Sequence, residues 1–590
     1  MSYSKFKDDS PQNTIKKINE ILNKLNISYS LDTTKRISGI YSSSFRDKLC
    51  GWVTCGKGTT AEYCEASALG EAMEHLCNGF AYDYSSLSSY AVEACNFLKF
   101  PDEIILPVEK IKEISPLVYE DFKYIYSLPN GQIPSDETLF NLIKKALGKE
   151  TLIYVPYYSV KQKKEIYLPE EIVDQLCGSN GGGAGNSAYE ALGHGLDEII
   201  ERYAKYQIYS KRLTPPTIPF EYISTKSPAL YETIKSIENN FGYKVIVKDA
   251  SLNNKFPVIA VTLIDPKNKS YMANFGCHPI FDIALERCLT EMFQFYEFGN
   301  NIIKRKNMTK WYTVEDHIID SRKNWVSLLK DDVGFLPDSF FASDSSWQFI
   351  EWKEFDDYTN EIGFRYQLEN LYNQADDIFI RNNSFLGFDV YRIYVPKYSI
   401  NNVPFNDKDL HSLSLCKDFI KKANEFTKLN PSEIEEYSES LFNPNTYVSS
   451  IIFHNMEEYM SYALHAALLY ERGLISQAMN ILRIQDNPLC QAALKVIELQ
   501  EKNTPLHRIK DLIDLFLNSE EKAFALCWCE QQVFLNLYKQ FVSNQYVVSN
   551  VGYGNHKTLP LNQLHISLKN QMKNVEINQK DIVLLVGNVL

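Results

Sequence analysis

The chain has 590 residues, a formal net charge of −13, 45% hydrophobic residues and 23% charged residues. This length exceeds what one hydrophobic core ordinarily supports, so we expect two or three domains. The acidic balance argues against a broad nucleic-acid-binding surface, which requires clustered Lys and Arg. The polar N-terminus, the absence of an apolar run of about 18 residues and the lack of any CxxC pair among the cysteines predict a cytoplasmic protein with reduced thiols and no membrane segment.

The first four hundred residues mix helical and strand patterns. Residues 14–26 place Ile and Leu at helical spacing and predict an amphipathic helix. Short segments rich in β-branched residues predict strands at 50–58, 151–157, 244–248 and 257–264. Further helices are predicted at 60–80, 187–206 and 281–299. This mixture predicts an α/β (α+β) catalytic domain over residues 1–405.

The remainder of the chain has a different pattern. Residues 406–545 are almost entirely helical in pattern and predict an all-α domain. Within it, 457–482 is typical of a helix, a turn at Gly473 and a second helix bearing Ala478, which is similar to one tetratricopeptide unit. No clean recurrence follows, so the pattern favours a scaffold or dimerisation domain over a peptide-binding groove. Residues 546–590 are predicted to form a C-terminal tail, whose role the sequence does not indicate.

Three of the predicted helices repeat one polar spacing. The positions i, i+4 and i+7 are Ser67, Glu71 and Glu74 in the first helix, His194, Glu198 and Glu201 in the second, and Arg287, Glu291 and Gln294 in the third. These positions lie within roughly 60° of one another, so each helix carries a polar stripe.

Such a stripe is ordinarily a solvated face with charge pairs. Carboxylates so close together repel one another unless cations compensate them, however, and the neighbours are Arg and Gln rather than the abundant Lys. Carboxylates that share a cavity suit Mg²⁺, whereas Arg and Gln suit phosphate oxygens. The stripes therefore predict a site for Mg²⁺ and a triphosphate.

Glycine-rich segments precede two of these helices. They are residues 56–60 (GKGTT) and 180–186 (NGGGAGN). Glycines before a helix N-terminus let backbone N–H groups approach an anion. Neither segment has the GxxxxGK[ST] pattern, and the kinase motifs are absent from the sequence. The pattern indicates nucleotide binding outside the common nucleotide-binding folds.

Together these segments resemble the YcaO family. The resemblance spans roughly residues 15–405 and is carried by residues 45–76, 179–203, 256–266, 274–294 and 391–396. It implies a YcaO-type ATP-binding fold followed by the helical domain. It also implies an activity, because YcaO enzymes use ATP to phosphorylate a peptide amide oxygen after a nucleophile has attacked the carbonyl. Loss of phosphate then leaves an azoline, a thioamide or an amidine.

The resemblance also implies roles for individual residues. The Mg²⁺ ligands would be Glu71, Glu74, Glu198, Glu201 and Glu291. The residues at the phosphates or the nucleotide would be Lys57, Ser67, Asn186, Glu190, Arg202, Arg287 and Gln294. Two positions depart from the family pattern: His75 replaces an Arg, and His194 replaces a Gln. Since imidazole is neutral over much of the physiological pH range, we expect a weaker hold on phosphate at His75.

The sequence indicates the substrate and the partners less specifically than the nucleotide site. The chain has neither a Pro-x-Pro-x-Pro end nor a winged-helix segment, which favours the stand-alone type of the family. Relatives of this type are linked to methylthiolation of a small-subunit ribosomal protein as accessory factors. A peptide or ribosomal-protein substrate, a methylthiotransferase or sulfur-handling partner, and a homodimer are therefore expected, with a thioamide-forming enzyme as the close alternative. A nucleotide-gated scaffold that recruits another enzyme, or a structural protein with a degenerate site, are the other hypotheses.

Overall fold

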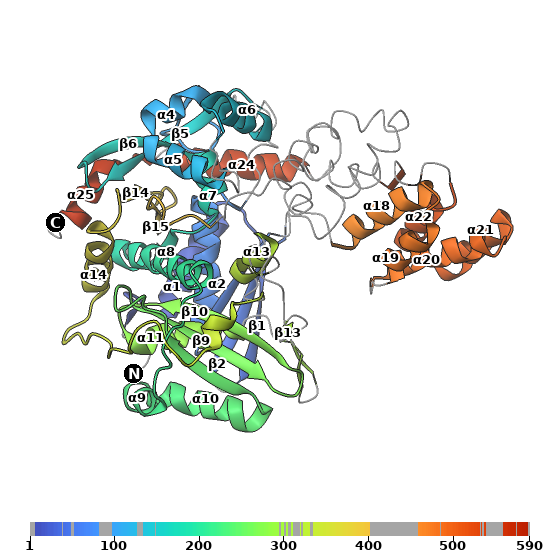
Figure 1. The fold of residues 1–590 in the computed structure, drawn as a ribbon. Coiled ribbons are helices and arrows are strands. Elements are labelled where there is room, and N and C mark those ends of the chain that lie inside the picture. Colours follow the sequence, from blue (N-terminus) through green and yellow to red (C-terminus); the bar gives the residue numbers. More distant parts are fainter. Residues whose placement is uncertain are drawn as a thin grey trace. The chain divides into compact units, whose positions relative to one another are not determined.

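The chain forms two compact units in a computed structural model (Figure 1). The first unit comprises residues 1–125, 135–403 and 556–590, and the second comprises 126–134 and 404–555. The structure describes residues 6–37, 39–48, 52–81, 97–126, 134–147, 149–293, 297–299, 302–304, 308–310, 319, 322–330, 334–401, 458–483, 485, 487–530, 533, 536–537, 558–573 and 575–587.

The described strands of the first unit pair only in antiparallel fashion. A three-stranded sheet has the order β1 (Tyr29–Ile37), β2 (Ile40–Asp47), β3 (Val53–Gly58). A four-stranded sheet has the order β13 (Thr309–Lys310), β10 (Ser270–Cys277), β9 (Val258–Asp265), β8 (Lys244–Asp249). A six-stranded sheet has the order β4 (Ile104–Pro107), β5 (Thr151–Ser159), β14 (Phe379–Asn382), β15 (Asp389–Tyr394), β7 (Gly182–Gly185), with β6 (Lys164–Pro169) also paired to β5. A short ribbon pairs β11 (Glu297–Gly299) with β12 (Ile302–Lys304).

Helices accompany these sheets along the first unit. They are α1 (Pro11–Lys24), α2 (Ala61–Cys77), α4 (Ile111–Ile114), α5 (Pro116–Ile125), α6 (Asp136–Leu147), α7 (Glu170–Cys177), α8 (Ala188–Ser210), α9 (Phe220–Lys226), α10 (Pro228–Phe241), α11 (Phe281–Met292), α13 (Arg322–Lys330), α14 (Asn360–Tyr372), α24 (Thr558–Lys573) and α25 (Ile582–Val586). The predicted mixture of helices and strands is therefore confirmed.

One predicted helix is too long. The helix expected over 281–299 ends at Met292, and Glu297–Gly299 form a strand instead. The sequence after Met292 is rich in Phe and Tyr, and aromatic residues favour strands over helices. Gln294, the last residue of the third polar stripe, lies outside the described residues.

Three helices lie at the junction of the sheets. Helix α2 packs against the three-stranded sheet, and α11 packs against β9 and β10. Helix α8 contacts β7 and β15 of the six-stranded sheet and β10 of the four-stranded sheet, and α14 packs along it (Figure 1). Helix α8 thus connects the six-stranded sheet to the four-stranded sheet, and α2, which also contacts β7 and β15, connects the three-stranded sheet to the six-stranded one.

The C-terminal segment is an integral part of the first unit. Helix α25 packs against β14, and Ile582 and Val586 are buried in the core that surrounds α8. The Gln579 side chain, 1% exposed, bonds to both main-chain groups of Asn382: its Oε1 accepts from the N–H at 2.7 Å and its Nε2 donates to the carbonyl at 3.0 Å. Residues 558–573 and 575–587 of the predicted tail therefore belong to the first unit, where α25 packs against the six-stranded sheet.

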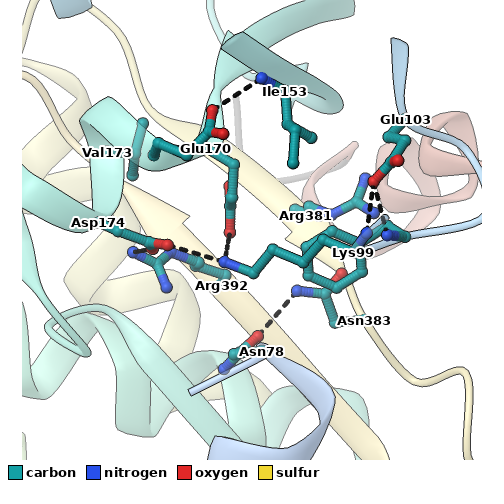
Figure 2. Close-up of polar contacts among 12 residues, drawn as sticks. Asn78, Lys99, Glu103, Ile153, Glu170, Val173, Asp174, Arg381, Asn383 and Arg392 are labelled. Carbon is teal, nitrogen blue, oxygen red and sulfur yellow. Dashed lines mark hydrogen bonds and ion pairs between the residues drawn. The ribbon is translucent and has the colours of Figure 1, made fainter. Parts of the chain in front are cut away.

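A buried group of charges joins that sheet to α7 and to the end of α2 (Figure 2). Arg392 and Arg381 are directly opposite each other on β15 and β14, and neither side chain is exposed. Arg392 pairs with Asp174 at 2.9 Å, and Lys99 pairs with the same carboxylate at 2.7 Å. Arg381 forms a two-pronged pair with Asp102 at 2.7 and 2.9 Å. Because cross-strand like charges repel, these acidic partners are what allow both arginines to be buried.

The second unit is helical in its described residues. Its helices are α18 (Glu458–Glu471), α19 (Ile475–Arg483), α20 (Pro488–Glu501), α21 (Leu506–Phe516) and α22 (Ser519–Cys527). The predicted turn is present: Gly473 has a φ of +76°, and Ala478 on the following helix is fully buried. A tetratricopeptide repeat stays a prediction. In neither unit does a described helix have the length and apolar character needed to cross a bilayer.

Candidate functional site

The first polar stripe lies on α2, directly after β3. Thr60 caps this helix by accepting from the Tyr63 N–H. Gly56 on β3 lies so close to α2 that a Cβ there would be 2.1 Å from the Cys64 carbonyl oxygen. Strand and helix are therefore locked together. The Glu71 carboxylate accepts from the Cys55 N–H at 3.3 Å, and the Ser67 hydroxyl oxygen accepts from the Lys57 N–H at 3.4 Å.

The second stripe lies on α8, which Ser187 caps. The preceding glycines form strand β7 rather than an open anion-binding loop. A Cβ on Gly183 would lie 2.1 Å from the Ala191 carbonyl oxygen, so glycine is needed for β7 to pack on α8. The Gly181 N–H donates to Glu198 at 3.3 Å, and Glu74 lies against Gly182. The glycines thus serve close packing around the carboxylates.

The acidic side chains of α2, α8 and α11 interact electrostatically across the junction. Partial burial, followed by the charges of Glu198 and Glu291, raises the pKa of Glu71 to about 7. Burial and then Glu198 and Glu71 raise the pKa of Glu74 well above its ordinary value. Burial and Glu291 raise the pKa of Glu201 to about 8. The glutamates of α2, α8 and α11 thus lie within electrostatic reach of one another, and their role as metal ligands stays a prediction.

Cations from different elements balance part of this charge. Lys57 on β3 donates to Glu291 on α11, and Arg202 pairs with Glu198 at 2.5 Å. Burial acts to raise the pKa of Glu291, but the charge and hydrogen bond of Lys57 outweigh it and lower that pKa. Arg287 on α11 pairs with Asp197 on α8 at 3.0 Å.

The donor set suits a hard cation. Among the residues that the structure describes, no three His, Cys, Asp or Glu side chains lie close enough together to enclose a metal ion. The types of donor nevertheless fit Mg²⁺, because it binds carboxylate oxygens and keeps several waters. The side chains of Glu71 and Glu291 are 39% and 32% exposed, so an ion can reach them from solvent. Burial is the main cause of the raised pKa values of Glu71 and Glu201, and the charges of neighbouring carboxylates add to it.

Two histidines at the site are neutral at physiological pH. Burial lowers the pKa of His75 to about 4, and its ring stacks with Trp52 at a centroid distance of 6.3 Å. Desolvation of the ring, and then the charges of Arg287, Lys7 and Lys57, hold the pKa of His194 well below its ordinary value. By its surface area the residue is nevertheless exposed. Neither ring supplies a positive charge for phosphate, as we expected for His75.

The N-terminal segment contributes residues that the sequence analysis missed. Glu190 accepts from the Lys7 ammonium at 2.9 Å and from the Asp8 N–H at 3.1 Å. Asn186 accepts from the Thr14 hydroxyl at 2.7 Å. Asn186 and Glu190 thus lie together, 3.2 Å apart at the closest. No helical spacing links Lys7 or Thr14 to α8, since more than 170 residues separate them.

Asp197 is a further buried acid that we did not single out. It precedes Glu198 on α8 and is 3% exposed. Its spacing from His194 is i+3, so a wider search of the same stripe includes it. In the sequence it lies between the buried Leu196 and the partly exposed Glu198.

The chain is similar to one protein family and to two bacterial proteins. Residues 55–399 match the YcaO cyclodehydratase family, which is described as ATP- and Mg²⁺-binding. The Escherichia coli protein named "Ribosomal protein S12 methylthiotransferase accessory factor YcaO" is 29% identical over 367 residues, 62% of this chain and 60% of that protein. An uncharacterized Haemophilus influenzae protein is 30% identical over 322 residues, 53% of each chain. The matches thus span no more than 60% of these relatives' lengths.

Solved structures are similar to this chain at lower sequence identity. A heterocyclase in complex with substrate and cofactor has a TM-score of 0.45 at 16% identity, covering 66% of this chain and 52% of that one. YcaO from Methanopyrus kandleri bound with AMPPCP and Mg²⁺ has a TM-score of 0.41 at 16% identity, covering 68% and 94%. The family match includes the whole of α2, α8 and α11 and more than half of the sequence, and the chain belongs to the YcaO family.

Proposed function

We propose that this chain is an ATP- and Mg²⁺-dependent enzyme that activates a peptide amide by phosphorylating its oxygen. The observation that carries the proposal is the convergence of acidic side chains from α2, α8 and α11 around a smaller number of cations. These acidic side chains interact electrostatically although they lie far apart in the sequence, as Glu71 and Glu291 do at a separation of 220 residues. The ATP- and Mg²⁺-binding description of the family supports the same chemistry.

The chain's own residues divide into two groups in this proposal. Lys57, Arg202 and Arg287 would contact phosphate oxygens, while the five glutamates would hold the cation, which neutralises charge on the triphosphate. The nucleophile attacks the amide carbon, and the amide oxygen then attacks the γ-phosphorus as ADP leaves. Loss of phosphate breaks the carbon–oxygen bond. Positioning and electrostatic stabilisation carry such a phosphoryl transfer.

The activated amide can give more than one product. Azoline formation fits the cyclodehydratase description of the family, and a thioamide requires a separate sulfur-handling partner. An accessory role in ribosomal-protein methylthiolation is the second candidate, favoured by the name of the Escherichia coli relative. In that role the helical second unit would recruit the modifying enzyme when nucleotide is bound. We further propose a cytoplasmic homodimer without nucleic-acid or membrane partners, for which light scattering well above the monomer mass of 68.1 kDa is the expected result.

Titration calorimetry of ATP with and without Mg²⁺ tests the proposed site. The wild type should bind ATP only when Mg²⁺ is present. Glu201→Gln keeps the side-chain shape and should weaken this binding by about tenfold or more, because a metal-binding carboxylate is lost. Glu62→Gln is the matched control, since Glu62 is exposed in the first turn of α2. Equal ATP affinity in Glu201→Gln and the wild type would refute the site.

A pull-down of the full chain with the cognate methylthiotransferase, with and without ATP, tests the second candidate. Nucleotide-dependent capture supports the accessory role. If ATP is bound and hydrolysed but no capture occurs under either condition, the accessory role is refuted while the catalytic proposal stands.

A further inference from the structure

A buried carboxylate connects the candidate phosphate-binding arginine to the protein core. Asp197 Oδ2 accepts from Arg287 Nη1 at 3.0 Å. Asp197 Oδ1 accepts from Gln367 Nε2 at 2.7 Å and also lies 3.7 Å from the Cys277 thiol. The two oxygens of one carboxylate therefore join α8 to α11 on one side and to α14 on the other.

Gln367 is held in one orientation. It is 1% exposed, and its Nε2 also lies 3.3 Å from Cys277 Sγ. A reversed amide would place its carbonyl oxygen against the Asp197 carboxylate, which is repulsive. The amide therefore acts as a donor to Asp197, and a charged acceptor makes this hydrogen bond stronger than a neutral one.

Arg287 extends from this support to the carboxylate site. Its side chain is 15% exposed, so it can be reached from solvent, whereas Asp197 behind it is buried. Its charge acts on Lys57, on Glu201 and on Glu291, which belong to three different elements. The guanidinium thus lies among the groups that we propose to bind Mg²⁺ and triphosphate.

We infer that Asp197 is a positioning residue that, with Gln367, holds the Arg287 guanidinium ready for the phosphates of ATP. A long side chain oriented during folding need not be ordered on binding, so its contact with phosphate strengthens the complex. The inference rests on the proposed function. The opposite role is an Asp197 that competes with phosphate for Arg287, and this role predicts the opposite result in the same experiment.

Asp197→Asn tests the inference because it keeps the shape and removes the charge. In titrations of the full chain with ATP and Mg²⁺, we expect this variant to raise the Kd for ATP by about tenfold, as loss of an orienting partner does at metal sites. Gln367→Met, which removes the second support and leaves Asp197 in place, should raise it by a smaller factor. Asp344→Asn, at an exposed loop position, is the matched control.

A double-mutant cycle with Arg287→Met separates positioning from general damage to the fold. If Asp197 acts through Arg287, the double variant should bind ATP no more weakly than Arg287→Met alone. A folding defect would instead add to the effect of Arg287→Met. Unchanged or tighter ATP binding by Asp197→Asn overturns the inference while the proposed function stands. Failure of the wild type to bind ATP with Mg²⁺ overturns both.

Discussion

Replacement of Arg392 by Met should destabilise the first unit substantially. The Arg392 side chain has no exposed surface and lies 4.7 Å over the Phe80 ring. Its Nη2 pairs with Asp174 at 2.9 Å (Figure 2). The same nitrogen donates to the Gly178 carbonyl at 2.9 Å. Met retains much of the side-chain length and removes the charge, so the effect of the substitution is mainly electrostatic.

The free-energy cost of Arg392→Met depends on the charges that remain in the protein. Removing one partner of a buried ion pair typically costs about 3–5 kcal/mol, because the other charge is left uncompensated. Asp174 keeps Lys99 at 2.7 Å, which moves the cost to the lower end. Arg381 lies directly opposite on β14, so the loss of the Arg392 charge also removes a repulsion between like charges. This relief offsets the cost by less than about 1 kcal/mol. We therefore expect a net loss of about 2–3 kcal/mol.

Urea unfolding followed by tryptophan fluorescence measures this loss, since five of the six tryptophans belong to the first unit. With a slope of about 3 kcal/mol per molar urea, the midpoint should fall by roughly 1 M. Arg46→Met is the matched control, because Arg46 is exposed on β2. Asp174→Asn in the Arg392→Met background should recover part of the loss. A midpoint for Arg392→Met that equals that of Arg46→Met would refute the reasoning.

Three further predictions concern the same unit. Burial and then Asp282 raise the pKa of Glu286 to about 8, so the folded state holds a proton that the unfolded state releases above pH 4.5. The wild type should therefore lose stability as pH rises from 5 to 8. In thermal or urea unfolding, the free energy of unfolding of Glu286→Gln should increase relative to that of the wild type by about 1.4 kcal/mol per pH unit. Parallel curves of stability against pH for the two proteins would contradict this. Gln579→Ala should cost about 1–3 kcal/mol by leaving the main chain at the end of β14 unpaired, and proteolysis should then cut the C-terminal segment faster than in the wild type. Gly183→Ala should lower the unfolding midpoint because its Cβ meets the α8 backbone, whereas Gly193→Ala, with open space around its Cβ, should leave the midpoint unchanged or raise it by up to about 1 kcal/mol in stability; the reverse order would count against close packing of β7.

Helical spacing predicted the polar stripes because it is a local property. Residues i, i+4 and i+7 share a face wherever a helix forms, so the stripes on α2 and α8 follow from the sequence alone. The strands β5, β8 and β9 were likewise predictable from their β-branched residues. The end of α11 was not, since the helical stripe was extended through a Phe- and Tyr-rich segment that forms a strand.

Contacts between distant segments were beyond the reach of the sequence. Nothing in the spacing around Lys57 indicates Glu291, which lies 234 residues away. The glycines before α8 are typical of an anion-binding loop, because glycine before a helix N-terminus lets backbone N–H groups approach an anion. The structure shows the other use of glycine, close approach of two backbones, and the packing of β7 against α8 reveals it.

The candidate site is held together by two long-range charge pairs that share one helix. Lys57 on β3 bonds to Glu291 on α11, and Arg287 on the same helix bonds to Asp197 on α8. Helix α11 therefore links the three-stranded sheet to α8, while α8 itself is fixed to the six-stranded sheet through β7 and β15. Since the three helices pack against strands of all three sheets, no local segment can set the distances among the glutamates. Those distances depend on the packing of the whole first unit, including its C-terminal segment, and a substitution far from the carboxylates can alter nucleotide binding through that packing.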